Sequence, residues 1–249
     1  MQYPKVQLAR FIQRPNRFLA YCQLEQTGET VIAHVKNTGR GQEVFLPQAL
    51  VALTYQASMT RKTDYDLIAV KKGERWINID SQVPNTLAVQ ALQNGTISLP
   101  GLTGNLVSLK RERRYGQSRF DIYLETDTGQ RAFVEVKGMT LENQGIGAFP
   151  DAPTLRGLKH VTELTQATVA GYRCYLLFVV QFEEVTMTTI HQAMQPALAS
   201  AVAKALDYGV VALAYNCLVT PATIEIQRRV PFQLQQVFVD PNISCEESK

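Results

Sequence analysis

The sequence predicts two folded parts, a small closed β-barrel followed by an α/β domain with a mixed sheet. Short apolar runs separated by Gly, Asn and Pro fill residues 1–82, a pattern typical of a small barrel. From about residue 105 helical patterns alternate with apolar runs, which is typical of a sheet covered on both faces. We therefore place the domains at 1–82 and 83–232, with a C-terminal tail over 233–249.

The first part is expected to form seven short strands, at 6–12, 17–25, 29–36, 43–47, 50–56, 65–71 and 75–80. Their number and spacing fit an OB-like barrel, a fold that binds strands of nucleic acid in a basic groove. The cations that can line such a groove are Arg10, Arg14, Arg17, His34, Lys36, Arg40, Arg61 and Lys62. For each of them taken alone, a solvated surface charge is the simpler interpretation.

The second part is expected to begin with a short helix at 86–94 and a hairpin of strands at 120–126 and 131–137. A turn-rich loop, a helix from Thr154, a strand at 174–180, a helix at 196–209 and a strand at 210–217 follow. From Gln233 onward no periodic pattern is present, so we expect the tail to be loose.

The hairpin carries the candidate site. Asp127-Thr128-Gly129 is a turn signal, and a turn centred on Thr128 places Asp121 directly opposite Glu135. The expected apolar face holds Phe120, Ile122, Leu124, Ala132, Val134 and Val136. The opposite face then holds Asp121, Tyr123, Phe133, Glu135 and Lys137.

Two carboxylates opposed across strands repel each other, so a cation or a bound proton is expected between them. Mg²⁺, or Mn²⁺, is the natural candidate, with Asp121 and Glu135 as its ligands. Lys137 then orients a water molecule or balances the developing charge of a phosphodiester. In the simpler alternative, Glu135 and Lys137 face water at a sheet edge and Asp121 pairs with an arginine.

Basic residues stand on both sides of this hairpin. Residues 108–119 carry five cations against the single acid Glu112, and these are Lys110, Arg111, Arg113, Arg114 and Arg119. In the next helix Arg156, Lys159, His160 and Glu163 share one face. We expect Arg113, Arg114, Arg119, Arg156, Lys159 and His160 to contact the phosphates of a polyanion. A solvated charge run is the alternative for both sets.

Composition excludes other classes. No apolar run approaches the roughly 18 residues of a membrane span, so we expect a cytoplasmic protein without a membrane partner. Cys22, Cys174, Cys217 and Cys245 are widely spaced, which favours free buried thiols over disulfides or zinc ligands.

The stretches "HVKNTGRG", "TRKTDYDLIAV", "INIDSQVPN", "RRYGQSRFDIYLE", "FVEVKGMTLE" and "FPDAPTLRGLKHVTEL" together resemble the sugar fermentation stimulation protein A family. The resemblance implies a DNA-binding protein with an N-terminal OB-like domain and a C-terminal domain similar to PD-(D/E)xK nucleases. It also implies a regulatory link to maltose and other sugar metabolism. The segment after Phe232 is expected to lie outside the family pattern.

Carried over by residue, the nuclease motif matches Asp121 as the central acid, Glu135 and Lys137 as the Glu-x-Lys pair, and Glu112 as an upstream acid. The sequence departs from the motif in two places. Phe120 stands where proline is usual, and Glu112 lies only nine residues before Asp121.

We therefore expect a DNA-binding protein, with RNA as another possible partner, and a Mg²⁺-dependent phosphodiesterase site. The alternative is a regulatory DNA-binding protein that keeps a nuclease-like fold without turnover. A sugar sensor coupled to DNA is a third hypothesis, but the sequence shows no aromatic-lined sugar pocket. Nothing in the sequence indicates the oligomeric state.

Overall fold

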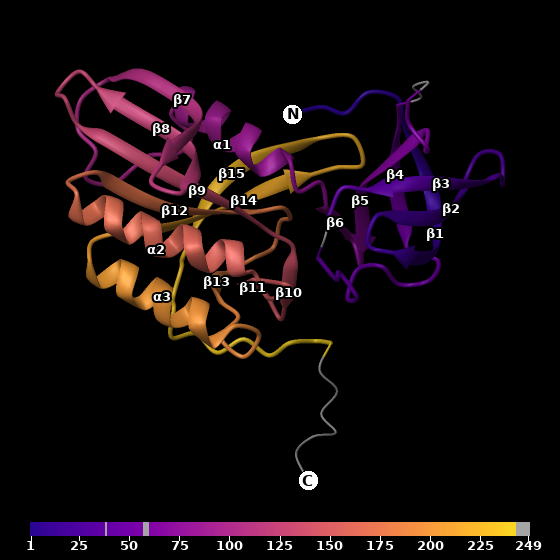
Figure 1. The fold of residues 1–249 in the computed structure, drawn as a ribbon. Coiled ribbons are helices and arrows are strands. Elements are labelled where there is room, and N and C mark those ends of the chain that lie inside the picture. The colour runs from indigo at the N-terminus through magenta and orange to yellow at the C-terminus, as the bar shows by residue number, and fades with distance from the viewer. Residues whose placement is uncertain (38, 57–59, 243–249) are drawn as a thin grey trace, which may run out of the picture.

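The computed structural model describes residues 1–37, 39–56 and 60–242. Figure 1 shows a barrel of short strands beside a larger part in which helices α2 (Leu155–Val169) and α3 (Pro196–Asp207) run along a sheet. The predicted fold class, an OB barrel followed by an α/β domain with a mixed sheet, is confirmed.

The barrel contains β1 (Val6–Asn16), β2 (Leu19–Leu24), β3 (Thr30–Val35), β4 (Leu50–Tyr55), β5 (Tyr65–Lys72) and β6 (Arg75–Asn78). The strand order is β3-β2-β1-β4-β5-β6, and a parallel pairing of β3 with β5 closes the barrel. Alternate residues of β2 and β3, such as Ala20, Cys22 and Ala33, are fully buried. This alternation is expected for a closed barrel whose inner face is the core and whose outer face is exposed to solvent.

The α/β part has a central sheet in the order β15-β14-β12-β9-β8-β7. Its strands are β7 (Leu106–Tyr115), β8 (Ser118–Thr126), β9 (Arg131–Met139), β12 (Arg173–Val180), β14 (Val211–Val219) and β15 (Ile224–Val230). Strands β9, β12 and β14 run parallel, and the outer pairs are antiparallel. A smaller sheet contains β10 (Leu141–Asn143), β11 (Ile146–Phe149) and β13 (Met187–Ile190).

Helices cover both faces of the central sheet, as predicted. Along β12, Leu176 and Phe178 pack with α2 (Leu155–Val169) and α3 (Pro196–Asp207), whereas Leu177 and Val179 pack with α1 (Val83–Gln93). Both faces of this strand are therefore apolar, which explains its unbroken hydrophobic run.

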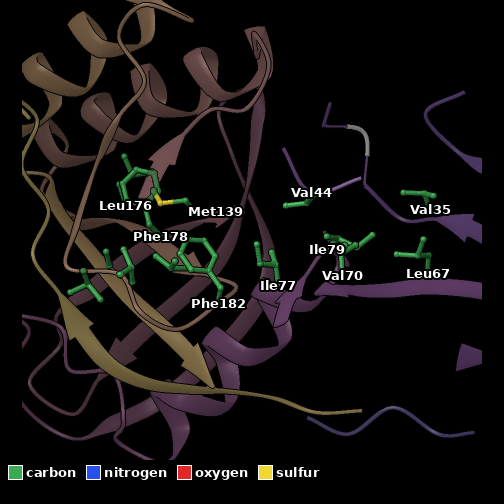
Figure 2. Packing of buried hydrophobic residues seen from close by; sticks show 14 of the residues in the cluster. Val35, Val44, Leu67, Val70, Ile77, Ile79, Met139, Leu176, Phe178 and Phe182 are labelled. Atoms are coloured by element: carbon green, nitrogen blue, oxygen red, sulfur yellow. The ribbon is translucent and has the colours of Figure 1, made fainter. Parts of the chain in front are cut away.

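Each of the two large hydrophobic clusters contains residues of both parts. Figure 2 shows Ile77 and Ile79 of the barrel together with Phe182 and Met139 of the α/β part, and all four belong to the same buried cluster. Hydrogen bonds reinforce the junction, because the backbone N–H of Asn78 donates to the Gln181 carbonyl and the Gln181 amide donates back to Asn78 Oδ1, both at 2.9 Å. The barrel is therefore firmly docked to the sheet.

Several local predictions were wrong. Residues 43–47 contain turns rather than a strand, and β11 lies in the expected turn-rich loop. The sequence analysis predicted no strand for β7, β10, β13 or β15. The segment after Gln233 is not loose as far as residue 242, because Phe238 and Asp240 are buried and Asn143 donates to the Val239 carbonyl.

The remaining expectations concern thiols and membranes. Cys22, Cys174 and Cys217 are free and buried as predicted, whereas Cys245 lies outside the described residues. Across the described part of the chain, no helix combines the length and hydropathy needed to cross a bilayer.

Candidate active site

The predicted hairpin forms with the predicted register. Ile122 pairs with Val134 and Tyr123 with Phe133, so that paired numbers sum to the same value as Asp121 and Glu135. Beyond Ile122 the ladder opens. The Asp121 carboxylate then takes the place of a strand partner, accepting hydrogen bonds from the Val136 backbone N–H and from the Asn85 amide, both at 2.8 Å.

This opening overturns one part of the prediction. Phe120 does not share the face of Ile122, because it packs with Phe133 at a centroid distance of 4.9 Å and with His160 at 6.4 Å, on the side of α2. The alternation of side chains fails where regular pairing ends. Asp121 is consequently reached by Asn85 of α1, a residue that the sequence analysis did not single out.

Glu135 is the most deeply buried acid of the site, with 1 % of its surface exposed. Its Oε1 atom lies 2.6 Å from Lys137 Nζ and 2.5 Å from His160 Nδ1. Its Oε2 atom is buried and has no hydrogen-bond partner within the described residues. One oxygen of this carboxylate is thus fully engaged, whereas the other is an unused acceptor.

The two acids are perturbed in opposite directions. Burial, together with the nearby charge of Glu135, raises the pKa of Asp121 above its usual value. Burial also disfavours the charged form of Glu135, but the hydrogen bonds from His160 and Lys137 and their positive charge outweigh it and hold its pKa low. Glu135 is therefore the ionised partner, and Asp121 the one that resists ionisation.

Both acids line a cleft of about 510 Å³ between the two parts of the molecule. Lys137, Asp151 and Arg156 line it from the α/β part. Arg17, Asn37 and Gly39 line it from the barrel. The cleft is therefore composite, a feature that the sequence analysis did not anticipate.

A loop of the barrel is held against this cleft from both sides. Arg14 donates to the backbone carbonyls of Arg17, Asn37, Gly39 and Arg40 at 2.7–3.0 Å. Asp151 accepts a hydrogen bond from the Gly41 N–H at 3.1 Å. A Cβ atom on Gly39 would lie 2.4 Å from the Asp151 carboxylate, so glycine is needed at this close approach.

The other candidate residues have different positions. Arg156 lines the cleft, but Lys159 is half exposed and donates to the Gln117 carbonyl away from it. His160 was expected to contact phosphate, and its position does not fit that role, because only 6 % of the residue is exposed and its Nδ1 atom is engaged by Glu135. Glu112 is exposed in an ion pair with Arg119 and does not line the cleft.

The barrel cations separate into two groups. Arg17 and Arg40 line the cleft or the depression next to it, and the Arg14 guanidinium is committed to backbone carbonyls. The second group lines a pocket together with the fully buried Asp66, and its members are His34, Lys36, Arg61 and Lys62. Arg10 pairs with Glu25 at 2.8 Å, whereas Arg113 and Arg114 are exposed on β7.

The site fits a divalent cation in part. No group of three or more His, Cys, Asp and Glu side chains that could hold a metal occurs in residues 1–37, 39–56 and 60–242. Mg²⁺, however, commonly takes one or two carboxylates and keeps several waters or substrate oxygens. The free Oε2 acceptor of Glu135 and the charge repulsion felt by Asp121 are the features that such an ion would relieve.

Comparison with known proteins gives matches to two family models. The SfsA N-terminal OB domain matches residues 12–79, and the sugar fermentation stimulation protein RE domain matches residues 82–223. The curated sugar fermentation stimulation protein homolog of Enterococcus mundtii is 56% identical over 243 residues, which cover 98% of this chain and 100% of the relative. Both family models end before Phe232, as expected for the segment after it, although the Enterococcus mundtii relative has a counterpart of most of this segment.

Two further relatives support these matches. The homolog of Clostridium acetobutylicum is 43% identical over 227 residues, covering 91% of this chain and 96% of that protein. The solved structure of Pyrococcus furiosus SfsA in complex with Ca²⁺ is 25% identical, with a TM-score of 0.82, and covers 94% of this chain and 98% of that one.

Proposed function

Because the chain belongs to the sugar fermentation stimulation protein family, we propose that it binds DNA and hydrolyses phosphodiester bonds at a site that uses Mg²⁺ or Mn²⁺. The observation that carries the proposal is the pair Asp121 and Glu135 in one cleft, with Lys137 beside them. That a relative was solved with Ca²⁺ supports a divalent ion here. The similarity to PD-(D/E)xK nucleases and the choice of DNA over RNA are parts of this proposal.

Asp121 and the free Oε2 atom of Glu135 would hold the cation. When bound, the cation would lower the pKa of a coordinated water and withdraw charge from the phosphate. Lys137 keeps its ammonium group on Glu135 Oε1, a position from which it can orient the attacking water or offset charge in the transition state. Arg156 and Arg17 would hold phosphates from opposite walls of the cleft.

His160 has a supporting role in this proposal. Its Nδ1 atom contacts the same oxygen of Glu135 as Lys137, which leaves Oε2 as the oxygen that would bind the cation. Ligand orientation by such outer partners is a general feature of metal sites.

A second candidate function follows from the same site. The described residues contain no group of three or more side chains that could ligate a metal, and Glu112 stays outside the cleft. This sparse ligand set favours a regulatory DNA-binding protein without turnover, in keeping with the name of the family.

Cleavage assays on labelled DNA and RNA with Mg²⁺ or Mn²⁺ test the proposal. We expect Asp121→Asn, Glu135→Gln and Lys137→Ala each to lower the rate by at least about 100-fold, as loss of a charge-stabilising group does. Binding measured in Ca²⁺ should stay within a few-fold of the parent. Glu225→Gln removes an exposed carboxylate of β15 and is the matched control.

The outcomes separate the two functions. Unchanged cleavage by the Asp121→Asn protein would show that the chemistry occurs elsewhere. Binding without cleavage of any nucleic acid would establish the regulatory function instead.

A further inference from the structure

A second depression lies on the barrel directly beside the cleft. It has a volume of about 580 Å³ and is lined by Phe11, Gln13, Arg17, Arg40, Gln42 and Phe45, among others. Arg17 and Gly39 line both this depression and the cleft. A polymer bound in one can therefore continue into the other without leaving the protein surface.

The floor of the depression is aromatic and preformed. The Phe11 and Phe45 rings lie 5.5 Å apart, and the Arg14 guanidinium stacks 4.8 Å from the centre of the Phe45 ring. Since Arg14 is fixed by four backbone carbonyls, these planar groups need no rearrangement before a ligand binds. Phe11 itself is only 3 % exposed, so the partly exposed Phe45 and Arg14 supply the planar surfaces, which are of the kind on which unpaired bases stack.

Polar groups at the rim complement this floor. Gln13 and Gln42 are exposed, and within the described residues neither side-chain amide makes a hydrogen bond. An amide offers both a donor and an acceptor, which is the combination that pairs with the edge of a base. Arg17 and Arg40 add positive charge for the adjoining phosphates.

The shape of the cleft argues against an intact duplex. Its walls come from two domains, and its volume of about 510 Å³ is that of a small-molecule pocket. A strand separated from its complement can place one nucleotide in such a cleft, whereas a paired one is held on the surface of its helix.

We propose that the depression, named here the barrel subsite, binds an unpaired base of a single strand whose neighbouring phosphate lies in the cleft. The preferred substrate class is then single-stranded nucleic acid, or the unpaired end of a duplex. This inference rests on the proposed function of the cleft.

Fluorescence anisotropy in Ca²⁺, with a labelled oligothymidylate and with the same strand in a blunt duplex, tests the subsite. The parent should bind the single strand at least about tenfold more tightly than the duplex. Loss of one base-stacking contact typically weakens binding by about 5- to 150-fold. We therefore expect Phe45→Leu to weaken single-strand binding by about tenfold and to leave duplex binding within twofold.

The double variant Gln13→Ala/Gln42→Ala keeps the test decisive if Phe45→Leu disturbs folding, because both amides are exposed. It should weaken single-strand binding several-fold. Lys204→Ala, which removes an exposed cation of α3, is the control and should bind as the parent does.

Equal affinity of the parent for both forms, or parent-like single-strand binding by the barrel variants, would overturn the subsite. In either of these cases, if the parent cuts DNA in Mg²⁺ and loses this cleavage with Asp121→Asn, the proposed function stands and only the subsite is wrong. If the parent neither binds nor cuts any nucleic acid, both proposals are wrong.

Discussion

At the scale of single residues, the two acids of the site differ in the groups that surround them. Glu135 is neutralised by Lys137 and His160, whereas Asp121 faces the charge of Glu135 with only neutral donors, the Asn85 amide and the Val136 N–H. A carboxyl whose folded-state pKa is raised stabilises the protein at low pH and loses that contribution as pH rises through its folded pKa. At neutral pH the metal-free protein therefore bears an unfavourable charge at Asp121.

Asp121→Asn should accordingly raise the melting temperature of the metal-free protein near neutral pH, and the gain should shrink as pH falls. Asparagine can still accept from Val136, and the Asn85 amide can rotate to meet it. A gain of about 1 kcal/mol corresponds to roughly 2–4 °C in a chain of this length. Mg²⁺ should stabilise the parent by mass action but not the variant. Equal stabilisation of both by Mg²⁺, followed by scanning calorimetry, would show that Asp121 is not a ligand.

Much of this pair could be predicted from the sequence, and its surroundings could not. The register of Asp121 and Glu135 depends only on the period of a strand and the place of the turn. The burial of His160 depends on how α2 packs, and the carbonyls around Arg14 come from a loop distant in the sequence. His160 and Arg14 were interpreted as surface cations because neither a helical wheel nor a count of charges includes tertiary contacts.

At the scale of secondary structure, the first turn of α2 determines where Arg156 and His160 lie. Thr154 caps the helix, since its hydroxyl accepts from the Gly157 N–H at 2.9 Å. A Cβ atom on Gly157 would lie 2.8 Å from the Thr154 methyl group, so the glycine makes room for the cap. Gln195 holds the backbone of Thr154 through two hydrogen bonds, at 2.9 and 3.2 Å.

Thr154→Ala should destabilise the protein by about 1 kcal/mol, within the range measured for lost N-caps. Because the first turn carries Arg156, cleavage should fall without being abolished, since Asp121 and Glu135 remain on their strands. Thr154→Ser keeps the oxygen and should restore both properties. Denaturant unfolding and cleavage rates measure them, and a Thr154→Ala protein that unfolds like the parent would show that the cap is dispensable.

The elements that were predicted correctly have an apolar face against a core, although β15, which also buries Ile224 and Ile226, was missed. The strand at 174–180 and the helices at 86–94 and 196–209 were found near their expected positions. Strand β7 was missed because it is an exposed edge strand rich in arginine, with no buried alternation to reveal it. The segment 43–47 was mistaken for a strand because it is apolar. Its Val44 is buried in a turn, within a cluster that also contains residues of the α/β part.

At the scale of the whole molecule, both ends of the chain tie the parts together. The N-terminal amine donates to the Ile224 carbonyl at 2.7 Å, and Tyr3 donates to the Ala222 carbonyl at 2.8 Å. At the other end, the Asn242 amide donates to Glu43 of the barrel at 3.3 Å. The cleft between the parts is thus framed by contacts that are remote in sequence.

The C-terminal contact places acids close together. Glu43 from the barrel, Asp151 from the wall of the cleft and Asp240 from the C-terminal segment are near enough to influence one another. Burial first, and then the charge of Asp151, raises the pKa of Glu43, whose Oε1 atom has no hydrogen-bond partner in the described residues. Burial and the charge of Asp240 likewise raise the pKa of Asp151.

Glu43→Gln therefore tests whether docking of the barrel depends on pH. The stabilisation from Glu43 is fully present below its unfolded pKa and is lost as pH rises through its raised folded pKa. At about pH 8 the buried charge of Glu43 therefore lowers the folding stability of the parent. The glutamine removes the charge and can still accept from Asn242, so its melting temperature should exceed that of the parent at about pH 8, with the difference narrowing toward about pH 5. Glu74→Gln, at an exposed acid of the barrel, should shift the melting temperature little at either pH. A lower melting temperature of the Glu43→Gln protein at the higher pH would mean that attraction to Lys72 outweighs burial, and that the charge itself holds the barrel in place.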